Sequence, residues 1–196
     1  MVKNYSIYLS KESKKIIALL NKIKNNKITN FNILCEKSII ALKNKKKIIF
    51  FGNGGSAADA QHLATELVVR FKKNRKPISA IALTTDTSIL TAISNDFSFK
   101  KIFSRQIEAI GMPGDIVIAI TTSGNSENLI EAIKMANKMD METFCFSGNR
   151  GGKIKKETKY PILVDSNETS TTQTVEIMIG QCFCEAIEDS ILNKEF

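Results

Sequence analysis

From Lys46 onward, short apolar runs alternate with stretches whose apolar residues recur at helical spacing. The runs expected to form buried strands are Lys47–Phe51, Ile78–Leu83, Asp115–Ile120, Thr143–Ser147 and Tyr160–Val164. The stretches expected to form helices are Ser56–Phe71, Thr87–Ile93, Phe99–Ile110, Glu127–Met139 and Thr171–Ile191. Continuous apolar strands that alternate with helices are typical of a parallel sheet covered on both faces. The pattern therefore predicts an α/β fold around a doubly wound, five-stranded parallel sheet.

Residues 1–45 are expected to form a helical leader. Ile16, Leu20 and Ile23 recur at helical spacing, and Asn30 is placed to cap a second helix from Phe31 to about Leu42. Such a leader would cover a sheet face or contact another subunit. No linker separates it from residues 46–196, so the 196 residues are predicted to form one domain.

A glycine-rich turn, Gly52-Asn53-Gly54-Gly55-Ser56, follows the first predicted strand, and Ser56 is the expected N-cap of the next helix. Glycines permit positive φ and a close backbone approach, and a helix N-terminus attracts anions. The spacing matches neither the dinucleotide fingerprint nor the P-loop. The turn indicates a small anionic ligand, although a purely structural glycine turn would have the same composition.

His62 and Glu66 are four residues apart in the predicted helix, so they share one of its faces. His62 is the only histidine in the chain. A histidine and a glutamate just beyond a ligand-binding turn are typical of an acid–base pair or of two metal ligands. The alternative is an exposed polar pair without a chemical role.

Hydroxyl side chains crowd the turn after the third predicted strand, directly before the helix at Glu127. They are Thr121, Thr122, Ser123 and Ser126. Hydroxyls, backbone N–H groups and a helix dipole can together bind a phosphate group without a cation. One hydroxyl would suffice for a helix cap, so this density favours a phosphate site.

The last predicted helix has one continuous apolar stripe. Its residues are Val175, Met178, Ile179, Cys182, Phe183, Ala186 and Ile187. Gln173 and Gln181 lie off this stripe, two turns apart, and alone would indicate nothing.

Composition excludes several classes of function. No apolar run reaches ~18 residues and no signal-peptide core is present, so we expect no membrane span and a cytoplasmic location. The four cysteines lack C-x-x-C spacing and are expected to be reduced and mostly in the core. The net charge is +8, but the lysine runs lack interleaved aromatic residues, so a nucleic-acid partner is not expected. A basic surface would also steer a phosphorylated substrate.

From about Lys46 to the C-terminus, the chain resembles the sugar isomerase (SIS) domain family. The matching motifs are Gly52-Asn53-Gly54-Gly55-Ser56, His62-x-x-x-Glu66, Asn95-Asp96-Phe97, Phe103-Ser104-Arg105, Thr122-Ser123-Gly124-Asn125-Ser126 and Gly148-x-x-Gly151-Gly152-Lys153. The resemblance implies a single SIS domain with a flavodoxin-like sheet. The His62/Glu66 pair resembles the branch that converts sedoheptulose 7-phosphate to D-glycero-D-manno-heptose 7-phosphate through an enediol, toward heptose of surface polysaccharides.

The same resemblance implies roles for individual residues. It implies that Glu66 and His62 are catalytic. The residues implied to bind substrate are Asn53, Gly54, Gly55, Asn95, Asp96 and Gln173 along the sugar, and Thr121, Thr122, Ser123 and Ser126 around the phosphate. Members can hold zinc through matches to His62, Glu66, Gln173 and Gln181. The resemblance further implies a homotetramer with sites built from more than one subunit.

Two positions depart from the family pattern. Gln181 stands where the family usually has a histidine, and Ser170 where members often have an aspartate. An amide can coordinate a metal or hydrogen-bond but cannot carry a proton, so His62 or an ordered water would be the second acid–base group.

Two non-enzymatic alternatives stay open at this point. A related SIS branch binds the replication initiator protein, and the stretches Ala82–Asp86 and Leu90–Asp96 resemble it. That branch tends to lose the carboxylate that matches Glu66, so the retained Glu66 favours the enzyme. The other alternative is a phosphosugar-binding regulator without turnover.

Overall fold

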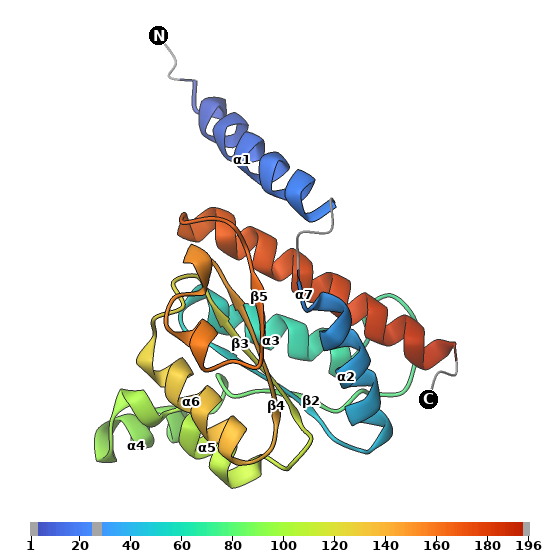
Figure 1. Ribbon diagram of the computed structural model, residues 1–196, viewed down its shortest axis with the longest axis vertical. Helices are drawn as coiled ribbons and strands as arrows, with labels where there is room; N and C mark the ends of the chain where they lie inside the picture. The colour runs from blue at the N-terminus through green and yellow to red at the C-terminus, as the bar shows by residue number, and fades with distance from the viewer. Residues whose placement is uncertain (1–3, 25–28, 194–196) are drawn as a thin grey trace.

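A single parallel sheet organises the computed structural model, which describes residues 4–24 and 29–193 (Figure 1). The strands in this part of the chain are β1 (Ile48–Gly52), β2 (Ala80–Ala82), β3 (Ile116–Thr121), β4 (Glu142–Ser147) and β5 (Tyr160–Leu163). They lie in the order β2-β1-β3-β4-β5, and every neighbouring pair is parallel. The predicted five-stranded, flavodoxin-like sheet is confirmed, and its topological switch point lies between β1 and β3.

Helices connect the strands and extend the chain at both ends. Over the described residues they are α1 (Ser6–Lys24), α2 (Phe31–Lys43), α3 (Gly55–Val68), α4 (Thr87–Asp96), α5 (Ser104–Ile110), α6 (Glu127–Lys138) and α7 (Thr169–Leu192). Short 3-10 helices are η1 (Phe99–Lys101), η2 (Asn149–Gly151) and η3 (Ile154–Lys156).

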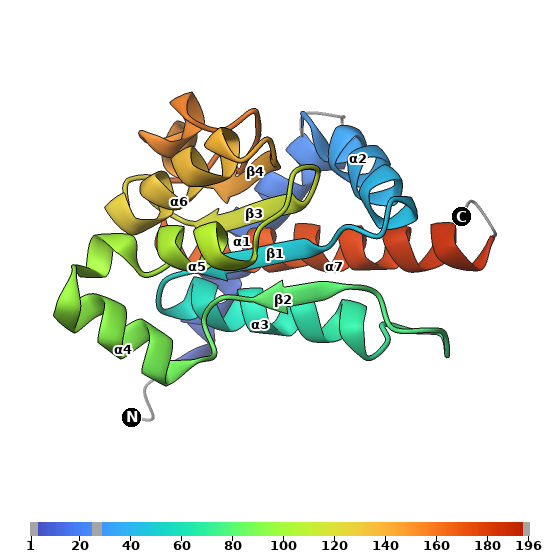
Figure 2. The same cartoon turned by 90° about the horizontal axis from the view of Figure 1, so that it is seen from below.

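The alternation of side chains along β1 builds a core on each face of the sheet. Ile48 and Phe50 pack with α2, α3 and α7, whereas Ile49 and Phe51 pack with α5 and α6 (Figure 2). All four side chains are fully buried. This two-sided burial explains why the central strands read as continuous apolar runs rather than as alternating ones.

Helix α1 projects from this body (Figure 1), and Glu12 and Lys15 on it contact Thr171 and Glu168 at the start of α7. Leu19 joins the core that contains α7. The large apolar side chains of the N-terminal part are exposed, and they are Tyr5, Ile7, Tyr8, Leu9 and Ile17. In contrast, α2 packs against the sheet through Leu34 and Ala41.

Some predicted element bounds were wrong. The strand expected at Ile78–Leu83 is only Ala80–Ala82, and because it lies at the sheet edge, Ile81 is 40% exposed. The helix expected at Phe99–Ile110 is interrupted at Ile102 and Phe103, where both side chains enter the core.

The cap predictions were also wrong. Helix α3 begins at Gly55 with Gly54 at the N-cap position, because Gly54 adopts the positive φ that ends the turn, and Ser56 is buried in the first turn. Asn30 stands before α2 but does not cap it. With a φ of 67°, it turns its amide away to donate to the carbonyl oxygen of Pro161.

Candidate active site

The glycine turn after β1 lies directly against α7. Gly54 has φ 55° and ψ −122°, a backbone conformation that side chains oppose. A Cβ atom on Gly55 would lie 2.2 Å from Nε2 of Gln173, so a side chain there would displace this amide. The turn predicted to bind a ligand therefore has an α7 amide beside it.

Helices α3 and α7 bring three of the predicted site residues together. Nε2 of His62 lies 3.0 Å from Oε1 of Glu66 and 3.5 Å from Nε2 of Gln181. The side chains of His62 and Glu66 are 47% and 22% exposed, so both are open to a ligand. A carboxylate that hydrogen-bonds an imidazole can take a proton and share it with its partner.

Gln173 makes a different contact, one that the sequence did not indicate. Its Nε2 donates to Oδ2 of Asp59, which lies 3.1 Å away on α3. Burial raises the pKa of Asp59, while the hydrogen bond from Gln173 and the nearby His62 act to lower it. The sequence held one signal for placing Asp59 in the site: it precedes His62 by three residues and so lies on nearly the same helical face.

Glu176, also missed from sequence, is a buried acid on α7. It is 1% exposed, and neither of its carboxyl oxygens has a hydrogen-bond partner within the described residues. Burial, together with repulsion from Asp59, raises the pKa of Glu176 to about 8. The predicted apolar stripe was right for Val175, Ile179, Phe183 and Ile187, which are buried. It was wrong for Cys182, which is exposed, and it left out Glu176 and Cys184, which face the core.

The hydroxyl-rich turn lies at the end of β3. Thr121 is buried, and its hydroxyl accepts from the backbone N–H of Gly124 at 3.2 Å, so it holds the turn in shape. The hydroxyl of Ser123 accepts from Asn125 N–H at 3.2 Å, and Ser126, directly before α6, makes no side-chain capping bond. Ser123 is exposed, and Thr122 and Ser126 are half-buried. Three hydroxyls therefore remain open to a ligand, and the fourth organises the loop.

The loop after β4 supports this turn from behind. Gly124 has φ 66°, and a Cβ atom there would lie 2.4 Å from the carbonyl oxygen of Gly151. The N–H of Ile154 donates to the carbonyl oxygen of Gly124 at 2.9 Å. The close approach of the two loops explains Gly124 and Gly152, since a Cβ atom on Gly152 would lie 2.6 Å from the backbone of Gly124.

Asn53 and Asn128 join the two ligand turns across the switch point. Each side-chain amide donates to the other, at 2.9 Å from Asn53 and 2.8 Å from Asn128. Asn128 is buried in the first turn of α6 and directly precedes the core residues Leu129 and Ile130 in sequence, which was the available signal. The pair fixes the glycine turn relative to the hydroxyl-rich turn.

Asn95 and Asp96 lie at the C-terminal end of α4. Both are exposed, and Asn95 donates to Asp96 at 2.8 Å. Within the described residues, neither hydrogen-bonds to the glycine turn or to His62 and Glu66. A single copy of the chain therefore does not link Asn95 and Asp96 to the other predicted site residues by hydrogen bonds.

The comparisons with known proteins agree with this geometry. The SIS domain family model matches residues 13–148. The phosphoheptose isomerase of Aquifex aeolicus is 53% identical over 154 residues, covering 79% of this chain and 81% of the relative. That of Paramagnetospirillum magneticum is 51% identical over 158 residues, covering 81% and 82%. The solved phosphoheptose isomerase of Neisseria gonorrhoeae superposes with a TM-score of 0.88 at 35% identity, covering 95% of this chain and 100% of that one.

The fold and the matched motifs define a phosphosugar-binding α/β protein. The chain belongs to the SIS domain family, and within it to the phosphoheptose isomerases.

Proposed function

We propose that this protein isomerises sedoheptulose 7-phosphate to D-glycero-D-manno-heptose 7-phosphate for heptose biosynthesis. The observation that carries the proposal is the pair of His62 and Glu66, 3.0 Å apart and next to a glycine turn. Relatives about half identical over most of the chain bear the name phosphoheptose isomerase. The retained Glu66 argues against the replication-initiator-binding alternative.

Aldose–ketose isomerisation moves one carbon-bound proton between neighbouring carbons. Glu66 would remove the proton from C1 of the ketose, giving an enediol, and return it to C2 of the aldose. Proton transfer of this kind by a placed carboxylate contributes ~10²–10⁴-fold to the rate. His62, hydrogen-bonded to Glu66, would hold or move the proton between the two substrate oxygens, while Gln181 would only hydrogen-bond.

The substrate phosphate would bind at the hydroxyl-rich turn. Ser126 directly precedes α6, whose N-terminus presents free N–H groups and the positive end of the helix dipole. Thr122 and Ser123 add open hydroxyls, and Thr121 keeps the turn in shape. Since the turn and the catalytic pair follow adjacent strands, a sugar phosphate would span the switch point.

A zinc ion is a further part of the proposal. The side chains of Glu66 and Gln181 approach the same imidazole nitrogen of His62, at 3.0 and 3.5 Å, and rotating the Gln181 amide would present its oxygen. These three residues would hold a zinc ion that is richer in oxygen ligands than usual, and Gln173, whose amide here donates to Asp59, would be the fourth ligand. Bound there, zinc would supply a Lewis acid that polarises substrate oxygens. In the described part of the chain, no three or more His, Cys, Asp or Glu residues form a metal cluster.

We also propose a homotetramer in the cytoplasm. The apolar residues exposed on α1 fit burial by another copy of the chain, and Asn95 and Asp96 would complete a neighbour's site. All four cysteines are free, which suits a reducing compartment. Over the described residues, no helix is both long and apolar enough to cross a bilayer.

The direct test is to incubate the purified protein with sedoheptulose 7-phosphate, with and without zinc, and to detect the aldoheptose phosphate. Formation of that product supports the proposal, and a zinc requirement would support the metal site. A folded protein that binds the sugar phosphate without turnover would contradict the enzyme and favour a phosphosugar-binding regulator.

A further inference from the structure

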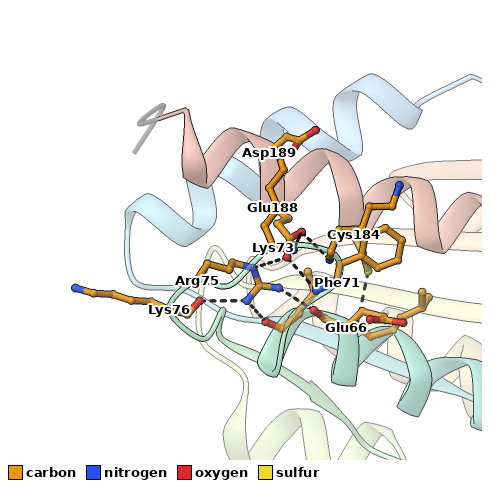
Figure 3. Close-up of polar contacts among 11 residues, drawn as sticks. Glu66, Phe71, Lys73, Arg75, Lys76, Cys184, Glu188 and Asp189 are labelled. Carbon is orange, nitrogen blue, oxygen red and sulfur yellow. Dashed lines mark hydrogen bonds and ion pairs between the residues drawn. The ribbon is translucent and has the colours of Figure 1, made fainter.

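A buried ion pair joins the segment that follows α3 to the C-terminal part of α7 (Figure 3). Nε of Arg75 donates to Oε2 of Glu188 at 3.0 Å, and the two side chains are 1% and 2% exposed. Removing two charges from water is costly unless further hydrogen bonds satisfy both groups. Further hydrogen bonds satisfy both the carboxylate of Glu188 and the guanidinium of Arg75.

Glu188 is held by three consecutive backbone N–H groups. Those of Phe71, Lys72 and Lys73 donate to its carboxylate at 2.9, 2.8 and 2.8 Å. Burial alone would raise the pKa of Glu188, but these bonds and Arg75 lower it overall. The ionised carboxylate thus fixes the segment that follows α3.

The rest of the Arg75 guanidinium binds the last turn of α3. Nη2 donates to the carbonyl oxygen of Glu66 at 2.7 Å, and Nη1 donates to that of Leu67 at 2.8 Å. Carbonyls at a helix C-terminus lack the usual helical partners, and a cation there is favourable. Arg75 therefore touches the backbone of the residue proposed as the base.

We propose that Arg75, fixed by Glu188, is a positioning residue that sets the location of Glu66 against α7. The proposal rests on the proposed role of Glu66. Nearby, the two helices meet tightly, since a Cβ atom on Gly180 would lie 2.5 Å from Leu63. Any shift of the end of α3 would therefore move Glu66 relative to Gln181. A misplacement of ~1 Å can cost ~10²-fold in rate.

Arg75→Lys is the main variant, because lysine keeps the charge but cannot bind Glu188 and two carbonyls in the same planar geometry. Glu188→Gln is the second, since it keeps the shape and removes the charge. The control is Lys73→Ala, which removes the Lys73–Asp189 ion pair, exposed and between the same two segments.

Two readouts separate positioning from a merely structural role. One is the split between kcat and KM, measured per folded protein. The other is the NMR signal of the imidazole Cε1–H, which belongs to one residue because His62 is the only histidine. Its chemical shift senses the nearby Glu66 carboxylate.

We expect Arg75→Lys and Glu188→Gln to lower kcat by at least about 10-fold with KM within about 3-fold, and to move the His62 signal. Lys73→Ala should leave kcat, KM and the His62 signal unchanged. Variants that fold, keep the wild-type kcat and leave the His62 signal in place would overturn the proposal. If the wild type itself does not turn over sedoheptulose 7-phosphate, the proposed function fails, and the His62 signal alone decides whether Arg75 positions Glu66.

Discussion

The side-chain amides of Asn53 and Asn128 exchange two hydrogen bonds, 2.9 and 2.8 Å long, across the switch point of the sheet. One residue belongs to the turn beside the proposed catalytic pair and the other to the helix behind the proposed phosphate turn. In the proposed site, their pairing would set the distance between the two ends of a bound sugar phosphate.

Asn128→Ala should therefore weaken both the fold and substrate binding. The substitution leaves the half-buried amide of Asn53 without its partner, and an unsatisfied amide costs about 1–3 kcal/mol when fully buried, so the cost here lies toward the lower end. We expect a lower free energy of unfolding in urea and a raised KM. A double-mutant cycle with Asn53→Ala should give a coupling energy of about 1 kcal/mol or more, whereas strictly additive effects would show that the pair is not a functional link.

Ser123→Ala and Ser126→Ala should each weaken binding of the sugar phosphate by roughly 1.5 kcal/mol, about tenfold in KM, the scale of a hydrogen bond to a charged group. Inorganic phosphate should compete with substrate in the wild type. The matched control is Ser79→Ala, because Ser79 is exposed directly before β2, at the N-terminal ends of the strands and away from the turn after β3. If KM in the Ser123→Ala and Ser126→Ala variants equals that of the wild type and of Ser79→Ala, the phosphate binds elsewhere.

Glu176→Gln should change how stability depends on pH. The pKa of Glu176 is raised from 4.5 to about 8 in the folded protein, so folding favours the protonated acid. Its contribution is fully present below pH 4.5 and is lost as the pH rises to about 8, a change of up to about 5 kcal/mol.

Relative to wild type, the Glu176→Gln protein should therefore gain stability between pH 5 and about 8, measured by urea unfolding across that range. Glu185→Gln is the control, because its side chain is 43% exposed on the same helix. A stability difference that stays constant with pH would mean that Glu176 is ionised in the folded state.

Sequence alone predicted the sheet, because its central strands are buried on both faces and read as continuous apolar runs. It also predicted that His62 and Glu66 share a helical face. It did not predict Asn128, Glu176 or Arg75, since their roles depend on contacts between segments distant in the chain. The Gln173–Asp59 bond links residues 114 positions apart, so helical spacing places Asp59 near the face of His62 but does not indicate its partner. The length of edge strand β2 was overestimated, because periodicity does not indicate which strand lies at the edge of the sheet.

Gln181→His tests the departure from the family pattern. Imidazole is a better zinc ligand than an amide oxygen, and it titrates near neutral pH. We expect the variant to bind more zinc, to turn over faster, or both, when metal content and kcat are measured beside the wild type. If the variant loses both zinc binding and turnover, Gln181 has a role of its own in the wild-type site.

The central claim is that Glu66 carries a proton between two substrate carbons. It is tested most directly by running the isomerisation in ²H₂O with the wild type, Glu66→Gln and the exposed neighbour variant Thr65→Ala. The wild type and Thr65→Ala should form the aldose with deuterium at C2, because the carboxylate exchanges with solvent. Glu66→Gln should lower kcat by at least ~10²-fold with KM little changed. Wild-type turnover by Glu66→Gln, with deuterium still entering at C2, would contradict the claim and assign the proton transfer to another group.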